Sequence, residues 1–157
     1  MLEIREALPI DCAFILQMIG ELAEFEKLSH QVVATEQSLR EQLFGKMPMA
    51  HVLIAEVDGA KAGFALYFYN FSTFLAKPGI YLEDLYVKES MRSHGIGLAI
   101  LKRLAKIAHE KNCGRFEWSV LDWNQKAIEF YVKIGARPQD EWTVYRMDES
   151  TIKKLCD

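Results

Sequence analysis

Apolar residues recur at three- and four-residue steps in two long stretches of the chain, which is the pattern of a helix with one buried face. The first stretch follows Pro9 and Asp11, which together are typical of a helix start. The second stretch runs over residues 95–111. Shorter helices are predicted over residues 35–43 and 124–134, because each begins at a good capping residue and is followed by a glycine.

Other stretches alternate between apolar and polar residues or are rich in β-branched and aromatic ones, and these predict strands. Asp58-Gly59 is typical of a hairpin turn between two of them. The segment from Asn70 to Gly79 is predicted to be a loop, since Pro78-Gly79 interrupts the pattern there. The predicted strands are residues 2–7, 51–57, 62–69, 81–87, 115–121 and 141–147, and a polar tail follows the last of them.

The order of these elements, β-α-α-β-β-β-α-β-α-β, predicts a fold of the α/β class in which helices cover one mixed sheet. Half of the residues are hydrophobic and about a quarter are charged, as in ordinary globular proteins. A chain of 157 residues without repeats or interior linkers fits a single domain over residues 1–157.

Composition and charge argue against several classes of function. A net charge of −3 argues against nucleic acid as a partner and is compatible with a cationic substrate. No apolar run reaches the length of a membrane span and the N-terminus lacks a signal-peptide pattern, so we expect no membrane partner and a cytoplasmic location. The three cysteines are expected to be reduced thiols, and the four histidines lack metal-ligand spacing, so no metal is expected.

The stretch with recognisable chemistry begins with Arg92-Ser93-His94-Gly95-Ile96-Gly97, which follows a predicted strand and passes directly into a long helix. Backbone N–H groups in a first helical turn lack intrahelical partners and carry partial positive charge, and glycines let a pyrophosphate approach closely. Neither a dinucleotide fingerprint nor a Walker loop is present, because Ile100 replaces the third glycine and Gly-Lys-Ser/Thr is missing. A plain glycine turn with a solvated Arg92 is the alternative interpretation.

Asn124 and Tyr131 follow in a second predicted helix. They are seven residues apart, about two helical turns, so both side chains lie on one face. Taken alone, Asn124 is equally a helix cap and Tyr131 equally a core aromatic. A phenol with an ordinary pKa of about 10 can, however, protonate a departing thiolate at pH 7.

In combination, these residues resemble the acetyl-CoA site of the GNAT superfamily of N-acetyltransferases, and more closely its spermidine/spermine (diamine) and thialysine acetyltransferase branch. The resemblance covers nearly the whole chain. It is carried by Ala23 to Ser29, Phe44-Gly45, Pro48, His51, Ala55-Glu56, Tyr81 to Asp84, Arg92-x-x-Gly95-x-Gly97, and Leu121 to Gln125 with Tyr131 and Gly135-Ala136.

The resemblance implies the GNAT fold, in which strand 81–87 splays from the strand beginning near Arg115 and the pantetheine arm of acetyl-CoA lies between them. It also implies acetyl-CoA as co-substrate and a homodimer. The implied coenzyme-binding residues are Leu85, Tyr86, Val87, Arg92, Ser93, His94, Gly95, Ile96, Gly97, Leu98, Asn124, Lys126 and Lys133.

Direct attack of an amine on the thioester in a ternary complex is the implied reaction. Tyr131 matches the family's general acid and Glu83 matches its proposed base, which acts on the ammonium directly or through water. An amine with a pKa of about 10 is protonated at pH 7, so a carboxylate here can both attract it and receive its proton. The implied substrate-binding residues are Phe25, Glu26, Glu83, Asp84 and Trp142.

Two departures from the branch bear on binding. Ser93 stands where a glycine is usual in the pyrophosphate loop, and we expect binding to persist because the backbone donor is kept. Ser72-Thr73-Phe74 replaces an acidic residue and Pro-Trp of the polyamine-specific members, and Ser-Thr is what the thialysine-preferring members carry. We therefore expect a primary amine of a small molecule, namely a thialysine-like amino acid, a diamine or a polyamine, and of these a thialysine-like amino acid or a small diamine fits better than spermine. A peptide or protein N-acetyltransferase of the same fold, and a non-catalytic coenzyme-A-binding module, are the alternatives.

Overall fold

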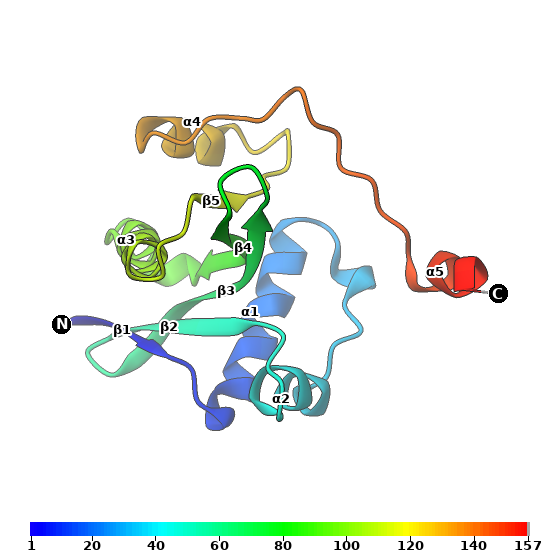
Figure 1. Cartoon of the computed structure of the whole chain (residues 1–157). Coiled ribbons are helices and arrows are strands. Elements are labelled where there is room, and N and C mark those ends of the chain that lie inside the picture. Colours follow the sequence, from blue (N-terminus) through cyan, green and yellow to red (C-terminus); the bar gives the residue numbers. More distant parts are fainter. Residues whose placement is uncertain (157) are drawn as a thin grey trace. The chain divides into compact units, whose positions relative to one another are not determined.

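The computed structural model describes residues 1–156, which form two compact units, one from Met1 to Ser119 and one from Val120 onward. The first unit contains a five-stranded sheet whose spatial order repeats the chain order (Figure 1). The first four strands pair antiparallel and the fifth is parallel to the fourth, so the prediction of a mixed sheet is confirmed. The strands are β1 (Leu2–Glu6), β2 (His51–Val57), β3 (Ala60–Ser72), β4 (Lys77–Val87) and β5 (Arg115–Trp118).

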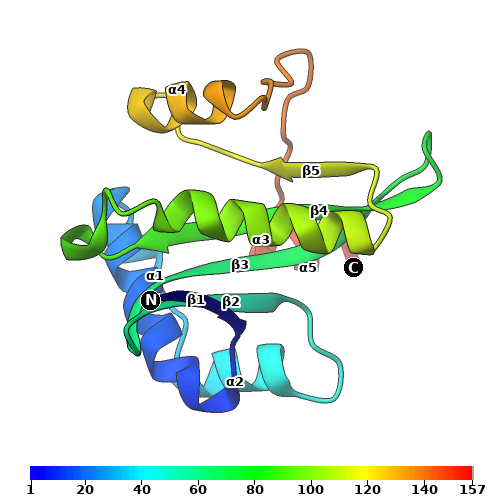
Figure 2. The ribbon, with the colours of Figure 1, turned by 90° about the vertical axis from the view of Figure 1, so that its left-hand side faces the viewer.

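Helices cover both faces of this sheet (Figure 2). On one face, Ile15 and Met18 of α1 pack in a core with Phe64 of β3. Alternate residues such as Leu53 and Ala65 are fully buried and face the other side, where α3 contacts all five strands. The helices of this unit are α1 (Cys12–Phe25), α2 (Glu36–Phe44) and α3 (Ile96–Glu110), with single 3-10 turns η1 (Pro9–Asp11), η2 (Ser29–Gln31) and η3 (Glu89–Met91).

The starts of these helices follow the signals in the sequence. Pro9 opens the turn η1 that leads directly into α1, as its fixed backbone angle favours. Thr35 caps α2, because its Oγ1 accepts the backbone N–H of Ser38 at 3.0 Å while Ser38 Oγ accepts the backbone N–H of Thr35 at 2.9 Å. The predictions of both helices are confirmed.

Three helices end in a Schellman motif, in which a left-handed residue lets two N–H groups return to carbonyls of the last turn. After α1, Lys27 N–H donates to the carbonyl of Glu24 at 3.0 Å and Leu28 N–H donates to that of Ala23 at 2.8 Å. A left-handed residue other than glycine costs about 1–2 kcal/mol, so surrounding contacts must hold the end of α1 in place. The left-handed residues are Lys27 (φ 60°) after α1, Asn112 (φ 55°) after α3 and Gly135 (φ 99°) after α4, a helix of the second unit (Gln125–Lys133).

The prediction of a loop over residues 70–79 is wrong. β3 and β4 both extend into this segment and are joined by a turn over residues 73–76. Gly79 lies inside β4, where an added Cβ would overlap Oδ1 of Asn70 and lie 2.9 Å from Cγ of Arg115. Close packing between strands therefore explains this glycine, and such a glycine has the same sequence signal as one in a turn.

The second unit contains α4, which confirms the prediction of a helix over residues 124–134, but the predicted strand at residues 141–147 is wrong. Those residues lie outside the helices and strands of the described chain, and Trp142 and Tyr145 are 80% and 93% exposed. High β-propensity does not suffice for a strand, because its backbone groups need a ladder partner. Similarly, the strand predicted over residues 115–121 ends early, at Trp118.

The polar tail, which was not predicted to be helical, forms the helix α5 (Glu149–Cys156). Its signal was present: Oδ1 of Asp148 accepts the backbone N–H of Thr151 at 2.8 Å, as a capping residue does. Over residues 1–156, no helix combines the length and the apolar composition that crossing a bilayer requires. That the whole chain is one domain stays a prediction.

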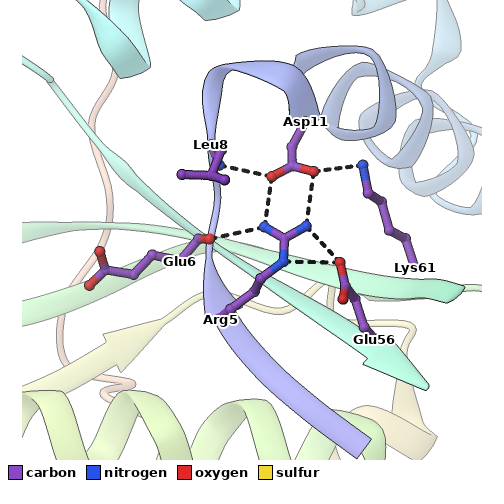
Figure 3. A network of polar contacts seen from close by, with 6 residues as sticks. All are labelled: Arg5, Glu6, Leu8, Asp11, Glu56 and Lys61. Carbon is purple, nitrogen blue, oxygen red and sulfur yellow. Dashed lines mark hydrogen bonds and ion pairs between the residues drawn. The ribbon is translucent and has the colours of Figure 1, made fainter. Parts of the chain in front are cut away.

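A buried carboxylate joins the first three strands to the turn that starts α1 (Figure 3). Asp11 is fully buried, and Nη1 and Nη2 of Arg5 donate to its two oxygens at 2.8 and 3.1 Å. Nζ of Lys61 lies 2.6 Å from Oδ1, and the backbone N–H of Leu8 donates to Oδ2 at 2.8 Å. Arg5 also donates to Glu56 at 2.6 Å. The Arg5 hydrogen bonds, more than any other contact, hold the pKa of Asp11 well below its usual range.

Candidate active site

A β-bulge in β4 falls at two consecutive acidic residues, Glu83 and Asp84. The ladder pairs Leu66 of β3 with Asp84 and Tyr67 with Leu82, so Glu83 between them has no partner on β3. A bulge breaks the strict alternation of side chains and is common beside active sites, because it can re-aim a side chain. In a regular strand the carboxyl groups of Glu83 and Asp84 would point to opposite faces of the sheet, and the bulge breaks this rule between them.

The same part of β4 is where β5 ends. The parallel β4–β5 ladder covers Gly79 to Leu82 on β4 and stops at Trp118 on β5, whereas β4 continues to Val87. Residues 83–87 thus lack a β5 partner, which matches the splayed strands that the resemblance implies. Backbone groups on this edge can pair with an extended ligand in place of a strand.

Three carboxyl groups gather at this point from two elements. Burial, together with the charges of Glu83 and Glu26, raises the pKa of Asp84 from its ordinary value of 3.8 to about 6. Burial also raises the pKa of Glu26, which caps the C-terminal end of α1. Because a neighbouring cation would relieve this repulsion, the cluster of Glu26, Glu83 and Asp84 favours a positively charged guest.

Residues 92–97 form the turn that enters α3. Ser93 (φ 69°) and Gly95 (φ 72°) both have left-handed backbone, which explains why glycine is usual at the position of Ser93. His94 folds onto this turn, with Nδ1 2.8 Å from the carbonyl oxygen of Arg92. Since a carbonyl only accepts, Nδ1 carries the hydrogen of that bond. The first N–H groups of α3 then follow without intrahelical partners.

Gly97, in the first turn of α3, has a bearing on whether this turn fits a pyrophosphate, because it lacks a side chain. Its backbone is not left-handed, and an added Cβ would make only an ordinary contact, 3.8 Å from Cδ2 of Leu85. The rest of the chain therefore does not require a glycine here, although glycine costs about 1 kcal/mol in a helix relative to alanine. A bare backbone leaves the N–H groups open to close approach, so the turn fits the pyrophosphate of acetyl-CoA.

In the second unit, α4 carries the other predicted site residues. Asn124 is the N-cap, and its Oδ1 accepts the backbone N–H of Ala127 at 3.4 Å, so the capping role is confirmed. Tyr131 is partly buried, with its ring centroid 5.7 Å from that of Phe130. At 100° per residue, Asn124 and Tyr131 share one face of α4 and the side chains of residues 126 and 133 lie on the opposite face. Coenzyme contacts by all four stay predictions.

Comparison with known proteins decides the family. The model of the acetyltransferase (GNAT) family matches residues 17–136. The chain belongs to the GNAT family. A thialysine N-epsilon-acetyltransferase of Sus scrofa is 42% identical over 163 residues, covering 97% of this chain and 95% of the relative. An L-ornithine N5-acetyltransferase of Arabidopsis thaliana is 32% identical over 197 residues, covering 97% of this chain and 86% of the relative.

A solved structure agrees with this assignment. An integron cassette protein from the mobile metagenome of V. cholerae matches with a TM-score of 0.82 at 31% identity, over 99% of this chain and 97% of that chain. The predictions of a GNAT fold and of an acetyl-CoA-dependent amine N-acetyltransferase are therefore confirmed, and so is the predicted branch.

Two features were predicted to shape the amine pocket of this GNAT chain. One lies far along β3 from Asp84, and the other belongs to the second unit. Ser72 to Phe74 sit at the β3–β4 turn, six positions along β3 from the partner of Asp84, which is about 20 Å at the rise of a strand. The substrate preference inferred from these residues therefore gains no support from the first unit. Trp142 is exposed in the second unit, so its contact with an amine stays a prediction.

Substitution of Asp84 is expected to change both the pH profile and the stability. Asp84 has a pKa of about 6, so its carboxyl group is mostly protonated below pH 6 and kcat/KM for the amine should fall there. Asp84→Asn should remove this acid limb of the pH profile and lower kcat/KM by about 10²-fold.

The raised pKa of Asp84 also means that the charged group destabilises the fold, with stability lost as the pH rises from about 4 to about 6. At pH 7, Asp84→Asn should therefore raise the free energy of unfolding by about 1–2 kcal/mol.

Asp58→Asn, which makes the same change in the exposed β2–β3 turn, is the matched control. It should leave the pH profile as it is. An acid limb that survives in Asp84→Asn would assign the titration to another group.

Proposed function

We propose that this GNAT chain transfers the acetyl group of acetyl-CoA to a primary amine of a small cation, a thialysine-like amino acid or a short diamine. The observation that carries the proposal is the cluster of Glu26, Glu83 and Asp84, where burial and the charges of Glu83 and Glu26 raise the pKa of Asp84 to about 6. Relatives that cover 97% of the chain bear the names of acetyltransferases for thialysine and for ornithine, both amino acids with a terminal amine.

The proposed chemistry needs two proton transfers. Acetyl-CoA supplies the acetyl group as a thioester. Glu83 or Asp84 takes the proton of the bound ammonium, directly or through water, so that the free amine can attack the thioester carbonyl. As the new C–N bond forms and the C–S bond breaks, Tyr131 gives its proton to the departing thiolate. The carboxylates of the bulge thus act on the amine and Tyr131 acts on the leaving group.

The experiment that tests the proposal measures thiol release from acetyl-CoA against a panel of amines. The panel contains thialysine, lysine, ornithine, putrescine, spermidine, spermine and an N-terminal peptide. We expect thialysine or a short diamine to give the highest kcat/KM. A preference for the peptide would establish a peptide N-acetyltransferase in its place, and binding of the coenzyme without turnover on any amine would establish a non-catalytic module.

A homodimer, implied by the family resemblance, and a cytoplasmic location, expected from the sequence, are also part of the proposal. Light scattering of the purified chain measures its mass directly. A monomeric mass of 18.1 kDa at working concentration would remove the dimer from the proposal.

A further inference from the structure

Three separate parts of the first unit meet at the entrance to the coenzyme turn. The guanidinium of Arg92 lies over two aromatic rings, with Cζ 5.1 Å from the ring centroid of Tyr86 and 5.5 Å from that of Phe25. Nε of Arg92 donates to the backbone oxygen of Val87 at 3.1 Å. A planar guanidinium stacks on rings and donates in its own plane, which an ammonium group cannot do in the same way.

The two rings under Arg92 are held very differently. Tyr86 on β4 is only 9% exposed and belongs to the core cluster that contains Phe14 and Met18. Phe25 is the last residue of α1 and is 43% exposed. Arg92 therefore connects a ring that the core fixes to a ring at the open end of a helix.

The end of α1 matters because the amine pocket begins there. Glu26 follows Phe25 directly, and its charge contributes to the raised pKa of Asp84, so the two carboxyl groups lie close enough to interact. The left-handed backbone at Lys27 (φ 60°) requires contacts that hold this end of the helix. The contact of Arg92 with Phe25 is one that comes from outside the helix.

We propose that Arg92 is a positioning residue for the amine pocket, an inference that rests on the function proposed above. Through its contact with Phe25, it fixes the end of α1 and sets Glu26 opposite Asp84. Because Arg92 also opens the turn that fits the pyrophosphate, one side chain ties the coenzyme turn to the amine pocket.

Arg92→Lys tests this assignment because it keeps the positive charge but removes the planar guanidinium and its Nε donor. We expect KM for the amine to rise about tenfold while KM for acetyl-CoA stays within about twofold. Phe25→Leu should raise KM for the amine in the same way, and the double variant should add little to either single change. Arg40→Lys on α2 makes the same substitution at an exposed arginine that pairs with Glu36, and as the control it should match the parent.

Amide hydrogen exchange provides a readout that does not depend on turnover. Without substrates, exchange at Lys27 and Leu28 should be faster in Arg92→Lys and in Phe25→Leu than in the parent chain. Unchanged exchange there, or a higher KM for acetyl-CoA with an unchanged KM for the amine, would overturn the positioning role and leave Arg92 as a simple phosphate contact. If the parent releases no thiol with any amine, the proposed function fails, and the exchange data still decide whether Arg92 holds the end of α1.

Discussion

Tyr131→Phe is expected to lower kcat for acetyl transfer by about 10²–10⁴-fold, the range that a positioned acid or base contributes. The change removes one oxygen and leaves the ring beside Phe130, so KM for the amine and for acetyl-CoA should change by no more than about threefold. A loss confined to kcat is the behaviour of a group that acts in the transition state. Thiol release with both substrates varied measures all three constants.

Tyr145→Phe is the matched control, because it removes the same oxygen from a ring that is 93% exposed in the same unit. It should retain the kcat of the parent. Thermal unfolding of both variants separates loss of an acid from loss of the fold. Full turnover by Tyr131→Phe would show that the thiolate departs without a proton from this residue, and the assignment of the acid would be wrong.

Asp11→Asn is expected to lower the free energy of unfolding at pH 7 by about 3–5 kcal/mol, the cost of breaking a buried ion pair from one side. The amide leaves Arg5 and Lys61 without the charge that both now contact, and it replaces one acceptor oxygen with a donor group (Figure 3). Single domains have a total stability of about 5–15 kcal/mol, so this one substitution removes a large share of it. It is the largest effect on stability that we expect from any single substitution. Urea unfolding with a two-state fit measures it.

The pH dependence of unfolding gives an independent check on Asp11. Its pKa in the folded chain is depressed, so its contribution to stability is complete above the unfolded pKa of about 4 and is lost as the pH falls further. The parent should therefore lose stability steeply below about pH 4, and Asp11→Asn should lose less over that interval. Asp140→Asn in the exposed part of the second unit is the control. A decrease below about 1 kcal/mol for Asp11→Asn would mean that Glu56 and water replace the carboxylate.

Much of the fold was predictable because local signals and tertiary packing agree. The apolar periodicity of α1 and α3, the Thr35 cap and the Asp58-Gly59 turn each act within a few residues, and all appear in the structure. The segments that failed depend on distant partners. Gly79 is in a strand because Asn70 and Arg115 crowd it, and residues 141–147 have the composition of a strand without a ladder to join.

The site shows the same division. Glu83 and Asp84 were predicted from a short motif, and the structure adds the bulge, which only the register with β3 reveals. The contact of Arg92 with Phe25 could not be predicted, because it joins residues on α1 and beyond β4 that no local pattern relates. The partly buried partners of Asp11 were missed as well, although Arg5, a charged residue within a predicted strand, was a signal that could have led to them.

The agreement between spatial order and chain order in the sheet has a consequence for synthesis on the ribosome. β2, β3 and β4 each pair with the strand made just before, so they can form a meander as soon as they emerge. β5 is parallel to β4 and can join only after α3 has been made and has crossed the sheet. The turn over residues 92–97 lies inside that crossover. A nascent chain that stops before Arg115 would therefore hold the antiparallel meander of β1 to β4 without the parallel strand at its edge.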